Sequence, residues 1–253
     1  MMSRLLLALL IATTTSLAHG APLRIAVADN FQATFEKLAA AYTKQSAEQV
    51  EGSYATTDEL YKRISDGIPY AALFAADGDK TAQLVADGRA KATSRFVYAI
   101  GRLALWTPAP GAPPPSEWLA DPQHRIAIAD PQTTLYGVAA KETLTSMKLW
   151  DRAQSRLAIA PSAEQAMQSV ENGTVPGGFV AQSQLVAHYK GTPPAAEAWL
   201  VPLNMHAPIV QEAVVLNTPD AERAQAFMRF VGSDAGRAII ESGGYMVLLP
   251  ASH

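Results

Sequence analysis

The chain has 253 residues, with 20 Lys and Arg against 23 Asp and Glu, so its net charge at pH 7 is −3, and it has no cysteine. A mildly acidic chain lacks the basic surface that binds nucleic acid or an anionic membrane. The absence of cysteine excludes disulfides, a catalytic thiol and a lipid-modified cysteine.

Residues 1–20, MMSRLLLALLIATTTSLAHG, have the pattern of a cleaved secretory signal. Arg4 precedes the apolar run LLLALLIA, which is too short to span a bilayer, and the small-residue site Ala18-x-Gly20 follows. This order disfavours the alternative, a buried N-terminal helix. We therefore expect a chain that begins near Ala21 and is exported to the periplasm. Loss of Arg4 leaves 19 basic against 23 acidic residues, a net charge of −4.

Beyond the leader, short apolar runs alternate with helical patterns. The predicted strands are 23–28, 50–55, 71–77, 125–131, 156–161, 177–182 and 209–217. A helix is expected after each strand, the first over residues 31 to about 47, and the Pro-rich run 107–118 is expected to be a loop. Strands interleaved with single helices predict an α/β fold with mostly parallel sheets, as one large domain or two lobes.

Ligands of such folds bind at the carboxyl ends of the strands, beside helix N-termini. Four strand-to-helix turns have the residues of helix starts: Asp29-Asn30, Thr56-x-x-Glu59, residues 133–137 and Ser162-x-x-Gln165. Asn30 is a favoured N-cap, and the second and fourth turns are capping boxes. Each turn alone is an ordinary helix start, and spacing alone does not show that the four converge.

Signatures of catalysis are missing from the sequence. The five histidines have no metal-ligand spacing, and there is no nucleophile elbow or P-loop. Asp77-Gly78-Asp79 lacks the later ligands of a calcium loop and predicts a turn, as do the Asp-Pro pairs at 121 and 130. We therefore expect no enzyme, no directly bound metal ion and no cofactor.

Seven pieces of the chain stand in an order and spacing that is fairly specific: IAVADNFQATFEKLAAAY, GSYATTDELYKRISDGIP, LFAADGDKTAQLVADG, SRFVYAIGRLALW, IADPQTTLYGVAAKETL, NGTVPGGFVAQSQL and PIVQEAVVL. Together they resemble the periplasmic molybdate-binding proteins of ABC importers, over essentially all of the mature sequence. The SRFVYAIGRLALW and LYGVAA pieces are most similar to the branch of this family with Asn in place of Ser in the first binding loop.

The resemblance implies a two-lobed clamshell that holds an oxyanion, molybdate or tungstate, between hydroxyls, amides and backbone N–H groups without counter-charges. It implies lobe one at residues 21–100 and 212–253 and lobe two at 101–211, with chain crossings near 98–106 and 207–214. It also implies an ABC permease as partner, and a cleft that opens and closes suits a monomer. Carried over by position, the ligand-binding residues are Asn30, Thr57, Tyr136 and Ala163, the last through its backbone N–H.

Asp29 and Asp58 depart from the family pattern, because they stand beside ligand positions where neutral residues are usual. Asp29 either points away and caps the helix or lines the cleft, where a carboxylate ~5 Å from a dianion opposes binding by several kcal/mol. Asp29, Thr56 and Asp58 are therefore additional candidates of the ligand loops. Two alternatives stay open: the same fold with another oxyanion, a neutral solute or a metal chelate, and an exported partner protein without a ligand.

Overall fold

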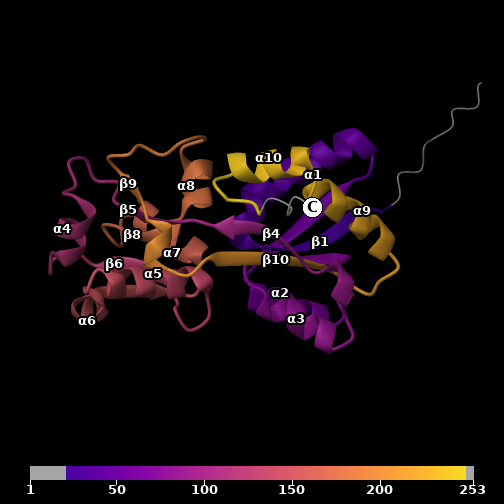
Figure 1. Cartoon of the computed structure of the whole chain (residues 1–253), viewed down its shortest axis with the longest axis horizontal. Coiled ribbons are helices and arrows are strands. Elements are labelled where there is room, and N and C mark those ends of the chain that lie inside the picture. Colours follow the sequence, from indigo (N-terminus) through magenta and orange to yellow (C-terminus); the bar gives the residue numbers. More distant parts are fainter. Residues whose placement is uncertain (1–20, 249–253) are drawn as a thin grey trace, which may run out of the picture.

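The computed structural model describes residues 21–248, and these form two α/β lobes joined side by side (Figure 1). The predicted signal peptide lies outside the described residues. The predicted two-lobed α/β fold is confirmed, with one five-stranded sheet in each lobe.

Lobe one consists of the first sheet and the helices packed on it. Its strands are β1 (Leu23–Ala28), β2 (Val50–Ala55), β3 (Ala72–Ala75), β4 (Phe96–Gly101) and β10 (Ile209–Val215). Its helices are α1 (Gln32–Ser46), α2 (Thr57–Ser65), α3 (Asp79–Ala86), α9 (Ala221–Val231) and α10 (Asp234–Ser242), with 3-10 turns η1 (Asp29–Phe31) and η2 (Ala92–Ser94). The strand order is β2-β1-β3-β10-β4.

Lobe two repeats this plan with the strand order β7-β6-β8-β5-β9. Its strands are β5 (Leu103–Trp106), β6 (Ile126–Ala129), β7 (Leu157–Ala160), β8 (Gly178–Ala181) and β9 (Ala198–Leu200). Its helices are α4 (Pro115–Ala120), α5 (Leu135–Ser146), α6 (Trp150–Ala153), α7 (Ala163–Glu171) and α8 (Gln182–His188), with 3-10 turns η3 (Gln154–Arg156) and η4 (Leu203–Met205).

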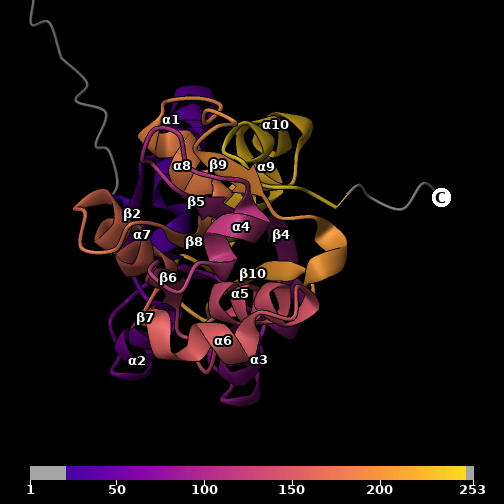
Figure 2. The same ribbon diagram turned by 90° about the vertical axis from the view of Figure 1, so that its left-hand side faces the viewer.

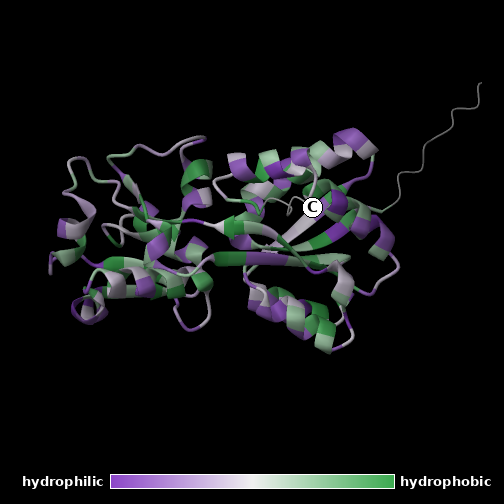
Figure 3. Cartoon of the chain, viewed as in Figure 1, coloured by the Kyte–Doolittle hydropathy of each residue, from purple (hydrophilic) through white to green (hydrophobic). Residues whose placement is uncertain are grey.

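Each sheet is covered by helices on both faces because successive side chains of a strand point to opposite sides. In β1, Leu23, Ile25 and Val27 face the core under α1, α9 and α10, whereas Ala26 faces the core under α2 and α3 (Figure 1). In lobe two, α4, α5 and α6 cover one face and α7 and α8 the other (Figure 2). Apolar and polar residues accordingly alternate along the helices (Figure 3).

The sheets are mixed rather than mostly parallel, which corrects part of the sequence prediction. β1 runs parallel to β2 and β3, and β6 runs parallel to β7 and β8. β10 and β5 run antiparallel to their neighbours. The reason is that β5 and β10 start at the lobe boundary, at the edge where the parallel strands end, and so run in the opposite direction.

The chain passes between the lobes at two places, through the β4–β5 connection and at the start of β10. Ile209 at the start of β10 packs in the core of lobe two, whereas Ala213 on the same strand packs in the core of lobe one. The two crossing strands β4 and β10 pair with each other. The two crossings therefore lie side by side, with Gly101 opposite Ile209.

Two local predictions differ from the structure. The Pro-rich run 107–118 is not all loop, because α4 begins at Pro115, and proline is tolerated in a first helical turn. Asn30 is not the N-cap of the first helix: η1 begins at Asp29 after Ala28, and α1 begins only at Gln32. No helix within residues 21–248 is long and apolar enough to cross a membrane.

Candidate functional site

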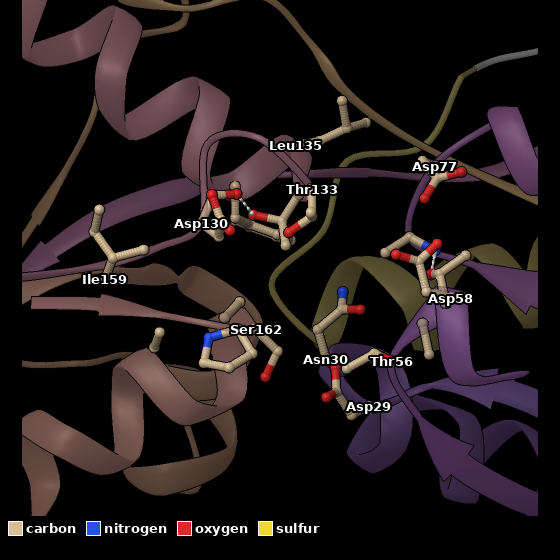
Figure 4. Close-up of a pocket in the computed structure, with 18 residues that line it drawn as sticks. Asp29, Asn30, Thr56, Asp58, Asp77, Asp130, Thr133, Leu135, Ile159 and Ser162 are labelled. Carbon is tan, nitrogen blue, oxygen red and sulfur yellow. Dashed lines mark hydrogen bonds between the residues drawn. The ribbon is translucent and has the colours of Figure 1, made fainter.

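The four strand-to-helix turns meet at one cleft between the lobes, with a volume of about 400 Å³ (Figure 4). Lobe one contributes η1 and the start of α2, which follow β1 and β2. Lobe two contributes the starts of α5 and α7, which follow β6 and β7. All seven residues named from the sequence line the cleft: Asp29, Asn30, Thr56, Thr57, Asp58, Tyr136 and Ala163.

Three of the helices are capped by a hydroxyl at their N-terminus. Thr56 accepts a hydrogen bond from the N–H of Glu59 at 3.3 Å, and Thr134 accepts one from Gly137 at 2.9 Å. Ser162 accepts one from Gln165 at 3.2 Å. Each cap satisfies the third N–H of its helix and leaves the first two without an intrahelical partner. The N–H groups of Thr57, Tyr136 and Ala163 are among those left, and helix N-termini of this kind attract anions.

The Thr57 hydroxyl is positioned by the neighbouring strand. Its oxygen accepts a hydrogen bond from the N–H of Ala76, just after β3, at 3.1 Å. The side chain is 9% exposed and lies on the cleft wall. Because the oxygen is used as an acceptor, the hydroxyl proton remains available to a bound solute.

Asn30 lies inside the protein because the 3-10 turn η1 directs it toward the boundary between the lobes. It is 7% exposed, and its Nδ2 donates to Gln211 Oε1 at 3.3 Å and to Tyr245 Oη at 3.4 Å. Tyr245 Oη in turn donates to the Asn30 carbonyl at 2.7 Å. These tertiary contacts, rather than helix capping, fix the Asn30 side chain. The amide Nδ2 has two protons and both go to these partners here, so Asn30 can donate to a solute in the cleft only in place of one of them.

Tyr136 comes from lobe two, and its side chain reaches Gln211 on β10 at the lobe boundary. Its hydroxyl oxygen accepts a hydrogen bond from Gln211 Nε2 at 3.2 Å. Burial raises the pKa of Tyr136, so the hydroxyl stays protonated and can donate. A Cβ on Gly101 would lie 2.4 Å from this oxygen, so the crossing strand must have glycine there.

Asp29 lies on the cleft wall, where its carboxylate accepts the N–H of Asn30 at 2.7 Å and does not cap a helix (Figure 4). Burial raises the pKa of Asp29 to about 6. The Asn30 N–H and the Ser162 hydroxyl oppose this rise, and the charge of Glu164 on the facing lobe adds to it. The cleft therefore contains a carboxylate that can take up a proton near neutral pH.

Three further aspartates line the cleft, and one of them has a cationic partner. Asp58 is 3.0 Å from Lys80 Nζ, and both lie in lobe one. Asp77 accepts the N–H groups of Asp79 and Lys80, and burial raises its pKa. Asp130 accepts the N–H of Gln132. Sequence reasoning treated Asp77 and Asp130 only as turn residues, although each follows a strand at the edge where ligands bind.

The eighteen lining residues include no Lys, Arg or His, so the cleft presents neutral donors and carboxylates only. Within residues 21–248 there is no group of three or more His, Cys, Asp or Glu that could hold a metal ion. Such a cleft can bind a compact polar solute through hydroxyl, amide and backbone donors.

Comparison with known proteins agrees with this description. The family described as "Bacterial extracellular solute-binding protein" matches residues 23–246. The molybdate-binding protein ModA of Azotobacter vinelandii is 33% identical over 96% of this chain and 97% of its own length. ModA of Rhodobacter capsulatus is 30% identical, covering 87% of this chain and 86% of the relative.

Solved structures give the same result. The periplasmic molybdate-binding protein of Azotobacter vinelandii superposes with a TM-score of 0.82 and 35% identity, over 90% of this chain and 100% of that one. A two-lobed α/β fold with a polar cleft between the lobes is the architecture of a solute-binding protein. This chain belongs to the family of bacterial extracellular solute-binding proteins. The predicted resemblance to molybdate-binding proteins is confirmed.

Proposed function

We propose that this protein is the periplasmic binding component of an ABC importer and captures molybdate or tungstate. The observation that supports this most is the convergence of Asn30, Thr57, Tyr136 and Ala163 on one cleft without a cationic side chain. A tetrahedral dianion accepts many hydrogen bonds, and these four positions offer donors from both lobes.

The strength of such a site follows from its donors. Each charge-assisted hydrogen bond contributes ~1.5–3 kcal/mol, and each helix N-terminus adds ~0.3–2 kcal/mol. Several such contacts in a closed cleft reach the ~−10 to −12 kcal/mol of a sub-micromolar complex. Two relatives named as molybdate-binding proteins support molybdate as the ligand.

The proposed protein is an exported chain of two lobes. Residues 1–20 act as a cleaved signal that delivers the chain to the periplasm. Lobe one comprises 21–100 and 212–253, and lobe two comprises 101–211. The closed form of a monomer is recognised by an ABC permease, and the protein has no enzyme activity and no cofactor.

A second candidate is the same fold with a different solute. The four aspartates that line the cleft, Asp29, Asp58, Asp77 and Asp130, favour a neutral solute or a metal chelate over a dianion. Against this candidate, Asp58 is paired with Lys80, and a carboxyl with the raised pKa of Asp29 can be neutralised by a proton.

Isothermal titration of the mature chain separates the candidates. The panel is molybdate, tungstate, sulfate, phosphate, citrate and metal–citrate chelates. We expect one molybdate or tungstate per chain with sub-micromolar affinity, and stabilisation against heat of ~3–4 kcal/mol at a thousandfold excess over Kd. Binding of a citrate chelate or citrate alone, with no response to molybdate and tungstate, contradicts the proposal.

Two variants test the site itself. Tyr136→Phe and Thr57→Ala each remove one donor hydroxyl, so each should weaken molybdate binding by about ten- to a hundredfold. The matched control is Tyr189→Phe, which removes a tyrosine hydroxyl of lobe two that contacts Trp106 and Glu197 away from the cleft. Unchanged affinity in both site variants would mean that the ligand is held elsewhere.

A further inference from the structure

Beneath the cleft lies a buried polar cluster that joins the two lobes. We call it the interlobe cluster, and its members are Asn30, Tyr98, Tyr136, Gln211 and Tyr245. Asn30, Tyr98 and Tyr245 belong to lobe one, Tyr136 belongs to lobe two, and Gln211 lies on the crossing strand β10. Buried polar groups of this kind are normally hydrogen-bonded, and here every side chain has a partner.

Gln211 occupies the centre of the interlobe cluster. It is 0% exposed, and the pairing of β10 with β4 shifts register between Gln211 and Glu212. Ile209, two residues before it, packs in lobe two, and Ala213, two residues after it, packs in lobe one. The Gln211 side chain therefore starts from the boundary between the lobes and contacts residues of both.

In the structure the Gln211 amide has its oxygen toward Tyr98 and Asn30 and its nitrogen toward Tyr136, and the Tyr98 hydroxyl is also 3.1 Å from the Ala75 carbonyl. Gln211 Oε1 accepts from Tyr98 Oη at 2.8 Å and from Asn30 Nδ2 at 3.3 Å. Its Nε2 donates to Tyr136 Oη at 3.2 Å. Since the Tyr136 oxygen is an acceptor within the cluster, its own proton is free for the cleft. With the amide reversed, Oε1 would take the Tyr136 proton and the cleft would lose this donor.

We propose that Gln211 is a positioning residue for the ligand, which fixes the side chain of Asn30 in lobe one and leaves the Tyr136 proton of lobe two for a bound anion. This inference rests on the proposed function and extends it, because Gln211 does not line the cleft. It makes the crossing strand, and not only the four loops, a determinant of anion binding.

The variant Gln211→Glu tests the direction of the hydrogen bonds. A glutamate has the size of glutamine, but when ionised it only accepts, so Tyr136 donates to it and not to the ligand. When protonated, its O–H replaces the Nε2 donor. We therefore expect molybdate affinity about a hundredfold below that of the wild type at pH 8, with the ratio recovering toward one as the pH falls.

The ratio of variant to wild-type molybdate affinity is compared at each pH, because this removes the effect of the other titrating groups. Tyr98 on β4 and Tyr136 on α5 hydrogen-bond to Gln211, and Tyr245 after α10 hydrogen-bonds to Asn30 beside it. Burial raises the pKa of all three tyrosines, so they stay neutral. The nearby carboxylates are Asp77, whose charge acts on Tyr98, and Asp29, whose charge acts on Tyr245. Their own titration occurs in both proteins and cancels in the ratio.

Gln211→Met and Gln184→Met provide a second, pH-independent test. Gln184 is a buried glutamine with two side-chain hydrogen bonds, to Ala181 and Glu164, and none to the interlobe cluster. Both methionine variants should lose thermal stability, but only Gln211→Met should lose affinity, by about tenfold and equally at every pH. This pair decides the question if Gln211→Glu does not fold.

A Gln211→Glu ratio that is flat across pH, or Gln211→Met affinity equal to that of the wild type, overturns the inference while leaving the proposed function intact. A wild-type chain that binds no oxyanion overturns the proposed function and the inference with it. Recovery of Gln211→Glu at low pH, together with unchanged affinity in Gln184→Met, supports the inference.

Discussion

The substitution Asp29→Asn should stabilise the ligand-free protein at neutral pH. Burial raises the pKa of Asp29 from 3.8 to about 6. Keeping this carboxylate ionised in the folded protein therefore costs up to about 3 kcal/mol. The folded state holds the proton more tightly than the unfolded state, so the free energy of unfolding falls as the pH rises from about 4 to about 6. The gain from Asp29→Asn should be complete above pH 6 and vanish below pH 4, as measured by urea unfolding.

The same residue should link molybdate binding to a proton. A dianion beside the Asp29 carboxylate raises its pKa further, so the complex favours the protonated form. With a free-protein pKa of about 6, about one molecule in a hundred is protonated at pH 8. Wild-type affinity should therefore fall by up to about a hundredfold between pH 5 and pH 8, whereas Asp29→Asn should vary little.

Titration calorimetry in two buffers with different ionisation enthalpies measures this linkage at pH 7. We expect the wild type to take up close to one proton per molybdate and Asp29→Asn to take up none. Asp130→Asn, which alters a cleft aspartate on lobe two, is the matched control and should keep the proton uptake. Equal affinity and equal proton uptake in wild type and Asp29→Asn would refute the reasoning, and the Asp29 carboxylate would then not face the ligand.

Three further predictions concern other parts of the site. Ala163→Pro removes the first N–H of α7 at a position where proline is tolerated, so affinity should fall about tenfold with stability kept, while Ala163→Gly binds normally in calorimetry. Gly101→Ala places a Cβ 2.4 Å from the Tyr136 hydroxyl, so it should lower both affinity and, by about 1–3 kcal/mol, stability in urea unfolding. Lys80→Met leaves Asp58 without its cation, so it should weaken binding at low salt and much less at 1 M salt; an effect independent of salt would exclude this electrostatic cause.

Local features of the fold could be predicted because they depend on neighbouring residues. Thr56 and Ser162 cap their helices as their capping-box spacing indicates. The strand over residues 23–28 is β1 with the predicted bounds, since its apolar side chains are buried on both faces of the sheet. Fold class follows from the alternation of such strands with helices.

Features that depend on distant contacts could not be predicted from spacing. Asn30 has the residue type of an N-cap, but contacts with Gln211 and Tyr245, 181 and 215 residues away, hold it in the interlobe cluster. The mixed pairing arises because β5 and β10 start at the lobe boundary, where the parallel strands end. The position of Gln211 could have been noticed in the sequence, because it is an uncharged polar residue in the mostly apolar strand IVQEAVV. Such a side chain in a buried strand needs hydrogen-bond partners.

The most direct test of the account is a crystal structure of the mature chain with tungstate, located by its anomalous scattering. We predict one tungsten position in the cleft, with ligand oxygens within hydrogen-bond distance of Asn30 Nδ2, Thr57 Oγ1, Tyr136 Oη and the N–H of Ala163. An empty cleft at saturating tungstate, or a tungsten atom bound only outside it, would contradict the central claim that these neutral donors form an oxyanion site.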